Sequence, residues 1–337
     1  MISEDIQAVC GELKKAGVDF EDKKVLITGG AGFLGSWISQ AVVEQGALVT
    51  CIDNLSSGQE SNIEELKDRE NFTFIQHDIS KPIYLEGDYD LVMHLASRAS
   101  PFEFDKFPIQ ILKANTLGIW VALGIAKKHK ARFLYTSTSE IYGDPDPKYI
   151  PTPESYNGNV NPVGPRSCYD ESKRAGEAFV KAYELQHGMD TRIVRIFNTY
   201  GPKMRAGDVY GRVVPRFIEQ ALNGKPITVF GDGTQTRSFT YVRDQVEGIL
   251  RLAWVEEAMG EVVNIGSNVE TKVIELAKII IQLTNSESEI VFHPLPKDDP
   301  RRRCPDITKA KNLLNWRPQV SLEEGLRKTI EWFEAGQ

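Results

Sequence analysis

The feature that most constrains the fold is a glycine-rich turn that follows an apolar segment near the N-terminus. Residues 24–28 predict a buried strand, and residues 34–45 predict the helix after it. Between them, Gly29, Gly32 and Gly35 form a G-x-x-G-x-x-G pattern. The first glycine lets the chain turn, the second lets backbone N–H groups approach a pyrophosphate, and the third lets the helix pack closely on the strand. Because a helix N-terminus carries partial positive charge, this arrangement predicts a dinucleotide site.

A second apolar segment indicates which dinucleotide the site takes. Residues 47–52 predict the next strand, and the acidic residue Asp53 follows it directly. A carboxylate at this position can bind both hydroxyls of an adenosine ribose and would repel a 2′-phosphate. The sequence therefore predicts NAD as the cofactor.

Strand and helix patterns alternate along the first part of the chain. Further strands are predicted at 72–76, 90–94, 131–136 and 191–195, with helices at 60–68, 108–128 and 172–187. This alternation predicts an α/β fold with a doubly wound parallel Rossmann sheet, in which ligands bind at the carboxyl ends of the strands.

The order of elements divides the chain into regions. Residues 1–20 have apolar residues at helical spacing and predict a helical extension that serves as a structural cover. We expect the NAD-binding domain to span 21–195 and to regain 236–266. A smaller C-terminal α/β substrate-binding region would comprise 196–235 and 267–337. Beyond residue 196, helices are predicted at 212–222, 242–256, 271–283 and 322–334, and strands at 227–230, 262–265 and 289–292. Glycine and proline crowd residues 143–166, which predicts a long ordered loop.

The charge balance limits the classes of partner. A formal net charge of −7 disfavours nucleic acid and anionic membranes as main partners. An acidic protein with an anionic ligand must concentrate its positive charge locally. The four cysteines are scattered without a zinc pattern, so we expect neither disulfides nor a metal site. We find no signal peptide and no apolar run long enough to span a bilayer, and we expect a cytoplasmic protein.

Tyr169 and Lys173 are candidate catalytic residues because they lie four residues apart, on one face of a predicted helix. An unperturbed phenol titrates near ~10, too high for a base at neutral pH. A neighbouring ammonium and the positive nicotinamide of NAD⁺ would favour the phenolate. The lysine can also hold the nicotinamide ribose.

A predicted strand at 131–136 leads into the polar residues Thr138, Ser139 and Glu140. In a parallel sheet its end faces the ligand crevice, which makes these residues candidates for catalysis. Alternatively, they only satisfy loop backbone groups at a polar strand exit.

Together with these features, the segment 195–202 (Arg-Ile-Phe-Asn-Thr-Tyr-Gly-Pro) resembles the sugar-nucleotide branch of the extended short-chain dehydrogenase/reductase superfamily. The resemblance runs from about residue 22 to the C-terminus. It implies further cofactor contacts from Phe33, Leu34, Asn54, Asp78, Ile79, Leu95, Ala96, Ser97 and Asn115.

Within this branch, segments 137–145, 161–171, 233–239 and 298–306 are similar to those of UDP-glucuronic acid decarboxylases. The related 4,6-dehydratases carry an aspartate where this chain has Ser139, and 4-epimerases usually lack the glutamate that follows. The resemblance implies substrate contacts from Asn198, Val213, Arg216, Thr228, Phe230, Arg237 and Arg303. Asn198, Arg237 and Arg303 would bind the diphosphate, while Thr228 and Phe230 would lie beside the uracil. Alternatively, the arginine run 301–303 is a solvated turn.

The resemblance implies a reaction without net redox. NAD⁺ would oxidise the sugar C4 hydroxyl with Tyr169 as base, and carbon dioxide would leave the resulting β-keto acid. Thr138 and Tyr169 would stabilise the enolate, which is then protonated at C5, and hydride return to C4 would give UDP-xylose. Ser139 and Glu140 would face C5 and C6. Glu140 would repel the substrate carboxylate, relay the C5 proton, or only order the loop.

Two segments depart from the decarboxylase pattern. Arg98 and Phe102 replace prolines that decarboxylases commonly carry, and Pro215-Arg216 replaces Ser-Asn. Arg98 would pair with a substrate carboxylate or face solvent. The alternatives are therefore a UDP-sugar 4-epimerase acting on UDP-glucuronate or UDP-glucose/galactose, an NDP-glucose 4,6-dehydratase, and a non-catalytic NAD-sensing module. The family usually forms homodimers through two helices, here 108–128 and 172–187.

Overall fold

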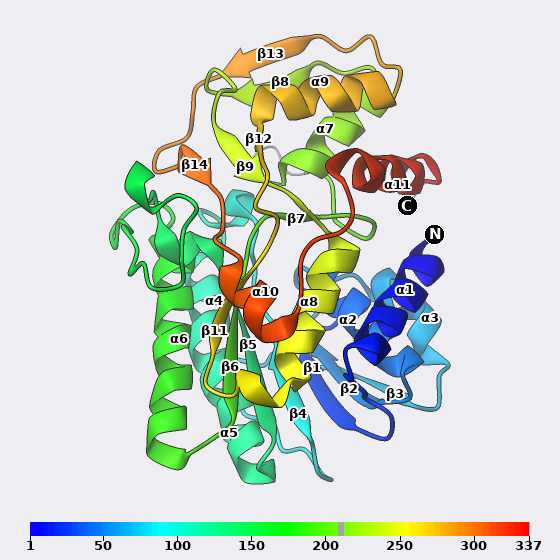
Figure 1. The fold of residues 1–337 in the computed structure, drawn as a ribbon, viewed down its shortest axis with the longest axis vertical. Coiled ribbons are helices and arrows are strands. Elements are labelled where there is room, and N and C mark those ends of the chain that lie inside the picture. Colours follow the sequence, from blue (N-terminus) through cyan, green and yellow to red (C-terminus); the bar gives the residue numbers. More distant parts are fainter. Residues whose placement is uncertain (208–211, 337) are drawn as a thin grey trace.

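The centre of the structure is a seven-stranded sheet, in which every pair of neighbours is parallel (Figure 1). The structure, a computed structural model, describes residues 1–207 and 212–336. The strand order is β11-β6-β5-β4-β1-β2-β3, so the order reverses between β1 and β4. The strands are β1 (Lys24–Thr28), β2 (Leu48–Asp53), β3 (Phe72–Gln76), β4 (Leu91–His94), β5 (Arg132–Thr138), β6 (Thr191–Ile196) and β11 (Val262–Ile265). The predicted doubly wound α/β fold is confirmed.

Helices cover both faces of the sheet because its strands are apolar on both sides. Val25 and Ile27 enter one core and Leu26 enters the other, as the alternation of a strand requires. One face carries α1 (Ile2–Lys15), α2 (Phe33–Glu44) and α8 (Val242–Trp254), and the other carries α5 (Ile119–His129) and α6 (Ser167–His187) (Figure 1). The helix predicted at 60–68 is a 3₁₀ turn (Glu60–Ile63) followed by a short α-helix, α3 (Glu64–Lys67).

Two helices near the predicted site differ clearly from their predictions. α6 begins at Ser167, five residues before the predicted start, so Tyr169 lies in its first turn. The predicted helix at 108–128 is divided into α4 (Pro108–Lys113), a π-helical segment (Ala114–Gly118) and α5. By length and composition alone, Pro108–His129 could cross a membrane, contrary to our expectation, and 44% of its apolar window is buried.

The smaller region lies over the carboxyl ends of the large sheet (Figure 1). It contains α7 (Val213–Leu222), α9 (Val273–Leu283) and α11 (Leu322–Glu334), with the parallel pair β8 (Ile227–Phe230) and β13 (Ile290–His293). A three-stranded sheet joins β9 (Thr236–Ser238), β12 (Glu270–Lys272) and β14 (Arg302–Arg303), and a two-stranded pair joins β7 (Thr199–Tyr200) and β10 (Thr240–Tyr241). Within 236–266, β11 and α8 join the large sheet, whereas β9 belongs to the smaller region. Helix α10 (Thr308–Leu314) had no counterpart in the sequence prediction.

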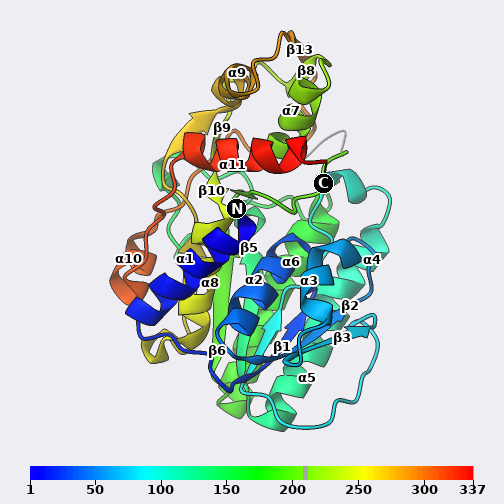
Figure 2. The ribbon, with the colours of Figure 1, turned by 90° about the vertical axis from the view of Figure 1, so that its right-hand side faces the viewer.

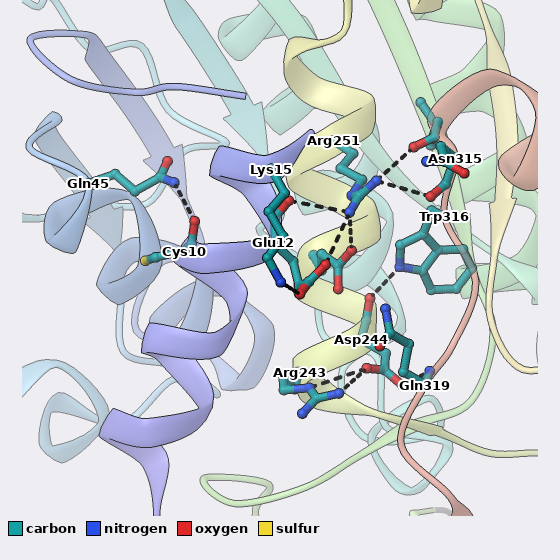
Figure 3. A network of polar contacts seen from close by, with 12 residues as sticks. Cys10, Glu12, Lys15, Gln45, Arg243, Asp244, Arg251, Asn315, Trp316 and Gln319 are labelled. Atoms are coloured by element: carbon teal, nitrogen blue, oxygen red, sulfur yellow. Dashed lines mark hydrogen bonds and ion pairs between the residues drawn. The ribbon is translucent and has the colours of Figure 1, made fainter. Parts of the chain in front are cut away.

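Polar contacts fasten the N-terminal helix and residues 315–320 to α8 (Figure 3). Arg251 of α8 donates from Nη2 to the Glu12 carbonyl at 3.4 Å and from Nη1 to the Asn315 carbonyl at 3.0 Å. Asp244 of the same helix accepts hydrogen bonds at 2.7 Å from the N–H groups of Gln319 and Val320. α1 also lies beside α2 in a second view (Figure 2), and its apolar face packs into the core. The extension is therefore an integrated part of the fold.

Candidate active site

A cavity of about 680 Å³ opens where the smaller region meets the carboxyl ends of the large sheet. This volume is in the range of small-molecule sites. Eleven lysines and arginines line it, against four aspartates and glutamates. Because the whole chain carries a net charge of −7, the cavity is a local concentration of positive charge. Its walls therefore favour an anionic ligand.

The glycine turn forms one wall of the cavity, and two of its glycines cannot be replaced. Gly29 has a φ of +76°, and a Cβ there would lie 2.7 Å from the Ala96 Cα. A Cβ on Gly35 would lie 2.1 Å from the Gly29 carbonyl oxygen, because α2 presses directly on the end of β1. Gly32 is more open and lines the cavity, where its backbone is accessible. These positions match the close backbone approach that a pyrophosphate requires.

Asp53 stands at the end of β2 and is held by backbone groups. The N–H of Ala31 donates to Oδ2 at 3.1 Å, and that of Leu55 donates to Oδ1 at 2.8 Å. Burial raises the pKa of this carboxyl, although both hydrogen bonds oppose the shift. A Cβ on Gly58 would lie 2.9 Å from Oδ2, so the loop passes close to the carboxylate. Sequence reasoning missed Gly58; a glycine five residues after the ribose-binding acid was its only signal.

Most of the other predicted cofactor residues lie together. The cavity lining includes Phe33, Leu34, Asn54, Asp78, Ile79, Leu95, Ala96 and Ser97. Asn115 is not part of the described lining. It is fully buried in the π-helical segment, and its Nδ2 donates to the Ser172 Oγ at 2.9 Å. Asn115 therefore acts behind the site, by holding that segment against α6.

Lys173 and Tyr169 meet at the floor of the cavity. Lys173 Nζ donates to the Thr136 carbonyl at 2.8 Å and lies 5.9 Å from the centre of the Tyr169 ring. Burial lowers the pKa of Lys173 to about 7. Burial and the charge of Glu140 raise the pKa of Tyr169, while a hydrogen bond with Thr138 opposes the rise. The protein groups thus favour the neutral phenol, and the positive charge of NAD⁺ is what would favour its ionisation.

Glu140 lies between two arginines. Arg166 Nη2 donates to Oε2 at 2.8 Å, and Arg303 Nη1 binds Oε1. These charges lower the pKa of Glu140 to about 2, although burial opposes the shift. Thr138 Oγ1 accepts the Glu140 N–H at 3.3 Å, which also orders the loop. Ser139 lies in the cavity lining beside them.

Only one residue of the arginine run 301–303 belongs to the site. Arg301 and Arg302 are exposed, whereas Arg303 is buried and lines the cavity. Within the described chain, Nε and Nη2 of Arg303 have no hydrogen-bond partner. These donors are available to an anionic group in the cavity. The structure places Arg303 against Glu140.

The remaining predicted substrate residues lie in the smaller region or border it. Arg237 Nη2 donates to Asp299 Oδ2 at 2.9 Å, and the Arg216 guanidinium lies 5.1 Å from the Phe230 ring centre. Asn198, Val213, Arg216, Phe230 and Arg237 line the cavity. Thr228 does not belong to the described lining. Gln220 of α7 donates to its Oγ1 at 3.0 Å and holds this side chain away from the cavity.

The Arg98 side chain is 14% exposed, so it does not face solvent. Its Nη1 donates to Glu103 Oε1 at 2.8 Å, and its guanidinium lies 4.4 Å from the Phe107 ring centre. The same Glu103 oxygen lies 3.4 Å from Arg205 Nη2. Arg98 still borders the cavity, but its charge is paired within the protein. Glu103, five residues along the chain, was a visible signal for this pairing.

Sequence reasoning also missed Arg166 and Asp170. Arg166 lines the cavity and lies three residues before Tyr169, a spacing that places both at the start of one helix. The late predicted start of α6 hid this relationship.

A sequence profile described as the NAD dependent epimerase/dehydratase family matches residues 25–266. The chain belongs to this family. The NAD dependence predicted from the glycine turn and Asp53 is thereby confirmed. The residues around the turn fit the dinucleotide, since backbone at Gly29 and Gly32 is accessible and Asp53 faces the cavity.

Relatives of this NAD dependent epimerase/dehydratase include curated decarboxylases. UDP-glucuronic acid decarboxylase 1 of Xenopus tropicalis is 48% identical over 311 residues, covering 92% of this chain and 72% of the frog protein. UDP-glucuronic acid decarboxylase 5 of Arabidopsis thaliana is 46% identical over 304 residues, covering 90% of this chain and 87% of the plant protein.

A solved structure of UDP-glucuronic acid 4-epimerase from Bacillus cereus, in complex with UDP-glucuronic acid and NAD, superposes with a TM-score of 0.81. It is 29% identical and covers 93% of this chain and 99% of its own. The structure of UDP-glucose 4-epimerase from Thermotoga maritima superposes with a TM-score of 0.83 at 32% identity, covering 93% and 99%. Decarboxylases are therefore markedly more similar in sequence than these epimerases of the same fold.

Proposed function

We propose that this protein is an NAD-dependent UDP-glucuronate decarboxylase that forms UDP-xylose through a 4-keto intermediate without net redox. The observation that carries the proposal is the position of Glu140, clamped between Arg166 and Arg303 beside Tyr169. The 44–48% identity to curated UDP-glucuronic acid decarboxylases supports it.

Bound NAD⁺ supplies the hydride acceptor, and later the hydride donor, for C4 of the sugar. Tyr169 takes the proton of the C4 hydroxyl, since it is the phenol in contact with Thr138 on the cavity floor. Lys173 supplies a nearby positive charge from its anchored position on Thr136. Once carbon dioxide leaves, the Tyr169 hydroxyl and Thr138 donate to the enolate oxygen at C4.

Glu140 acts at the C5 and C6 side of the sugar. Because Arg166 and Arg303 keep it ionised, it disfavours a close approach of the substrate carboxylate and so prepares that group to leave as neutral carbon dioxide. The remaining donors of Arg303 bind the anionic substrate, and Arg237 and Asn198 line the cavity at the diphosphate side. The two arginines hold the Glu140 carboxylate in place, so its surroundings need not reorganise during the reaction.

A second candidate is a UDP-glucuronate 4-epimerase, favoured by the similarity to the Bacillus cereus structure. One assay separates the two activities. The protein is incubated with NAD⁺ and UDP-glucuronate labelled at C6, and released carbon dioxide and the nucleotide products are measured. Labelled gas with a UDP-pentose supports the decarboxylase. A UDP-hexuronate epimer without gas would overturn it.

We further propose a homodimer formed through α4, α5 and α6. Large apolar residues remain exposed along this stretch: Ile109 and Leu112 of α4, Leu117 of the π-helical segment and Trp120 of α5. Burial against a partner would cover the face that makes Pro108–His129 resemble a membrane helix by composition. Light scattering should give twice the mass of the chain, and Trp120→Glu should reduce it to that of a monomer. Tyr84→Glu, at an exposed apolar residue outside these helices, is the control.

A further inference from the structure

Asp170 is a buried acid next to Tyr169 that the proposed mechanism leaves unused. It lies in the first turn of α6, and its side chain is 8% exposed. Oδ2 lies 3.6 Å from Arg166 Nε. Oδ1 is buried and accepts no hydrogen bond from the part of the chain that the structure describes. Burying a carboxylate with one oxygen unsatisfied is unfavourable, which suggests that Asp170 has a functional role.

Arg166 connects Asp170 to the catalytic carboxylate. Its Nη2 donates to Glu140 at 2.8 Å while its Nε faces Asp170. The other oxygen of Glu140 binds Arg303. The four side chains form a continuous row, Asp170–Arg166–Glu140–Arg303. The last three line the cavity, whereas Asp170 stands behind them and is not among the described lining residues.

We propose that Asp170 is a positioning residue that acts through Arg166 and sets the net charge around Glu140. The inference rests on the proposed decarboxylation. Ionised Asp170 balances the row at two carboxylates and two guanidiniums. Protonated Asp170 leaves two guanidiniums against Glu140 alone, and the excess positive charge holds the substrate carboxylate more strongly.

The titration of the row is consistent with this role. Burial and the charge of Glu140 raise the pKa of Asp170 to about 7, while Arg166 and Arg303 oppose the rise. Glu140 stays ionised throughout this range. The other groups that sense Asp170 are the Cys168 thiol and the Tyr169 phenol, and its charge raises the pKa of both. Two neighbouring carboxyls whose environments separate their pKa values are typical of divided catalytic roles.

The ionisation of Asp170 should change kcat and KM in a defined direction. Decarboxylation moves negative charge from C6 to the C4 oxygen, so excess positive charge at C6 stabilises the substrate more than the transition state. Both kcat and KM should therefore rise as Asp170 ionises through neutral pH. Asp170→Asn fixes the row in its positively charged form. At pH 8.5 we expect kcat of this variant to be about 10- to 100-fold below that of the wild type, and KM to be lower as well. The rise of kcat and KM through neutral pH should be absent.

The matched control is Glu171→Gln, because Glu171 is the next acid on the same helix, is half-buried with 37% of its side chain exposed, and pairs with Arg174 outside the row. It should keep the wild-type kcat, KM and pH profile. If Asp170→Asn does not fold, Asp170→Ser serves for the same comparison. Unchanged pH profiles of kcat and KM in the Asp170 variant would overturn the proposal.

A second measurement does not use turnover. Folded Asp170 titrates above its unfolded value of about 3.9, so the folded state binds the extra proton between these two values. Its contribution to stability falls as pH rises through that window. Asn cannot lose stability in this way. The melting temperature of Asp170→Asn relative to wild type should rise from pH 5 to pH 8, and that of Glu171→Gln should not. A flat difference would overturn the titration of Asp170. Failure of the wild type to release carbon dioxide would overturn the proposed function alone.

Discussion

Arg166 Nη2 lies 2.8 Å from Glu140 Oε2, and this contact joins the start of α6 to the end of β5. The helix carries Tyr169 and Lys173, and the strand leads to Thr138. The contact therefore fixes the proposed base, Tyr169, relative to Glu140, the carboxylate that we propose acts at C5 and C6 of the sugar. Placement of this kind contributes strongly to rate.

Glu140→Gln should slow carbon dioxide release far more than it weakens substrate binding. We expect kcat to fall about 100-fold or more, because the side chain loses the negative charge that faces C6 of the substrate. The amide keeps part of the contacts with Arg166 and Arg303. Steady-state kinetics with UDP-glucuronate measures both constants. Equal losses in kcat and in substrate affinity would make Glu140 a structural residue.

Tyr169→Phe should abolish turnover and preserve NAD binding. The phenyl ring keeps the stacking with Phe104, whose centre lies 5.1 Å away, and loses only the hydroxyl. The expected decrease in kcat is about 100-fold or more, and calorimetric titration with NAD⁺ should give nearly the wild-type affinity. A variant that retains most of its activity would refute the role of Tyr169 as base.

Lys173 should make stability depend on pH in the alkaline range. Its folded pKa of about 7 lies below the unfolded value of about 10.4. The unfolded chain therefore binds the extra proton between these values, and stability rises with pH across them. Lys173→Met lacks this rise. In thermal melts, the melting temperature of the variant relative to that of the wild type should be higher at pH 6 than at pH 10. A constant difference would contradict the lowered pKa.

Gly58→Ala should weaken NAD binding without unfolding the protein. Its Cβ would lie 2.9 Å from Asp53 Oδ2 and would displace the carboxylate expected to hold the ribose. Gly11→Ala is the matched control, since its Cβ would meet nothing within 4 Å on α1. That change should stabilise the helix by roughly 0.5–1 kcal/mol. Equal NAD affinity in both variants would exclude the proposed contact.

Local patterns were sufficient to predict the sheet, the glycine turn and the catalytic segment, because strand and helix periodicity and glycine spacing are encoded over a few residues. Local patterns could not predict contacts between segments that are distant in the sequence. Glu140 and Arg303 are 163 residues apart, and only the tertiary fold pairs them. The family resemblance implied ligand contacts for Asn115 and Thr228, yet a neighbouring helix holds each side chain, and a motif in one segment does not show that contact.

The Glu140–Arg303 pair spans two regions of the molecule, since Glu140 follows β5 of the large sheet and Arg303 belongs to β14 of the smaller region. Any swing that widens the crevice enough to discharge a product would pull these partners apart. Glu140 would then lose its partner whenever the crevice is open to water, so we expect the proposed 4-keto intermediate to form only while the pair is intact.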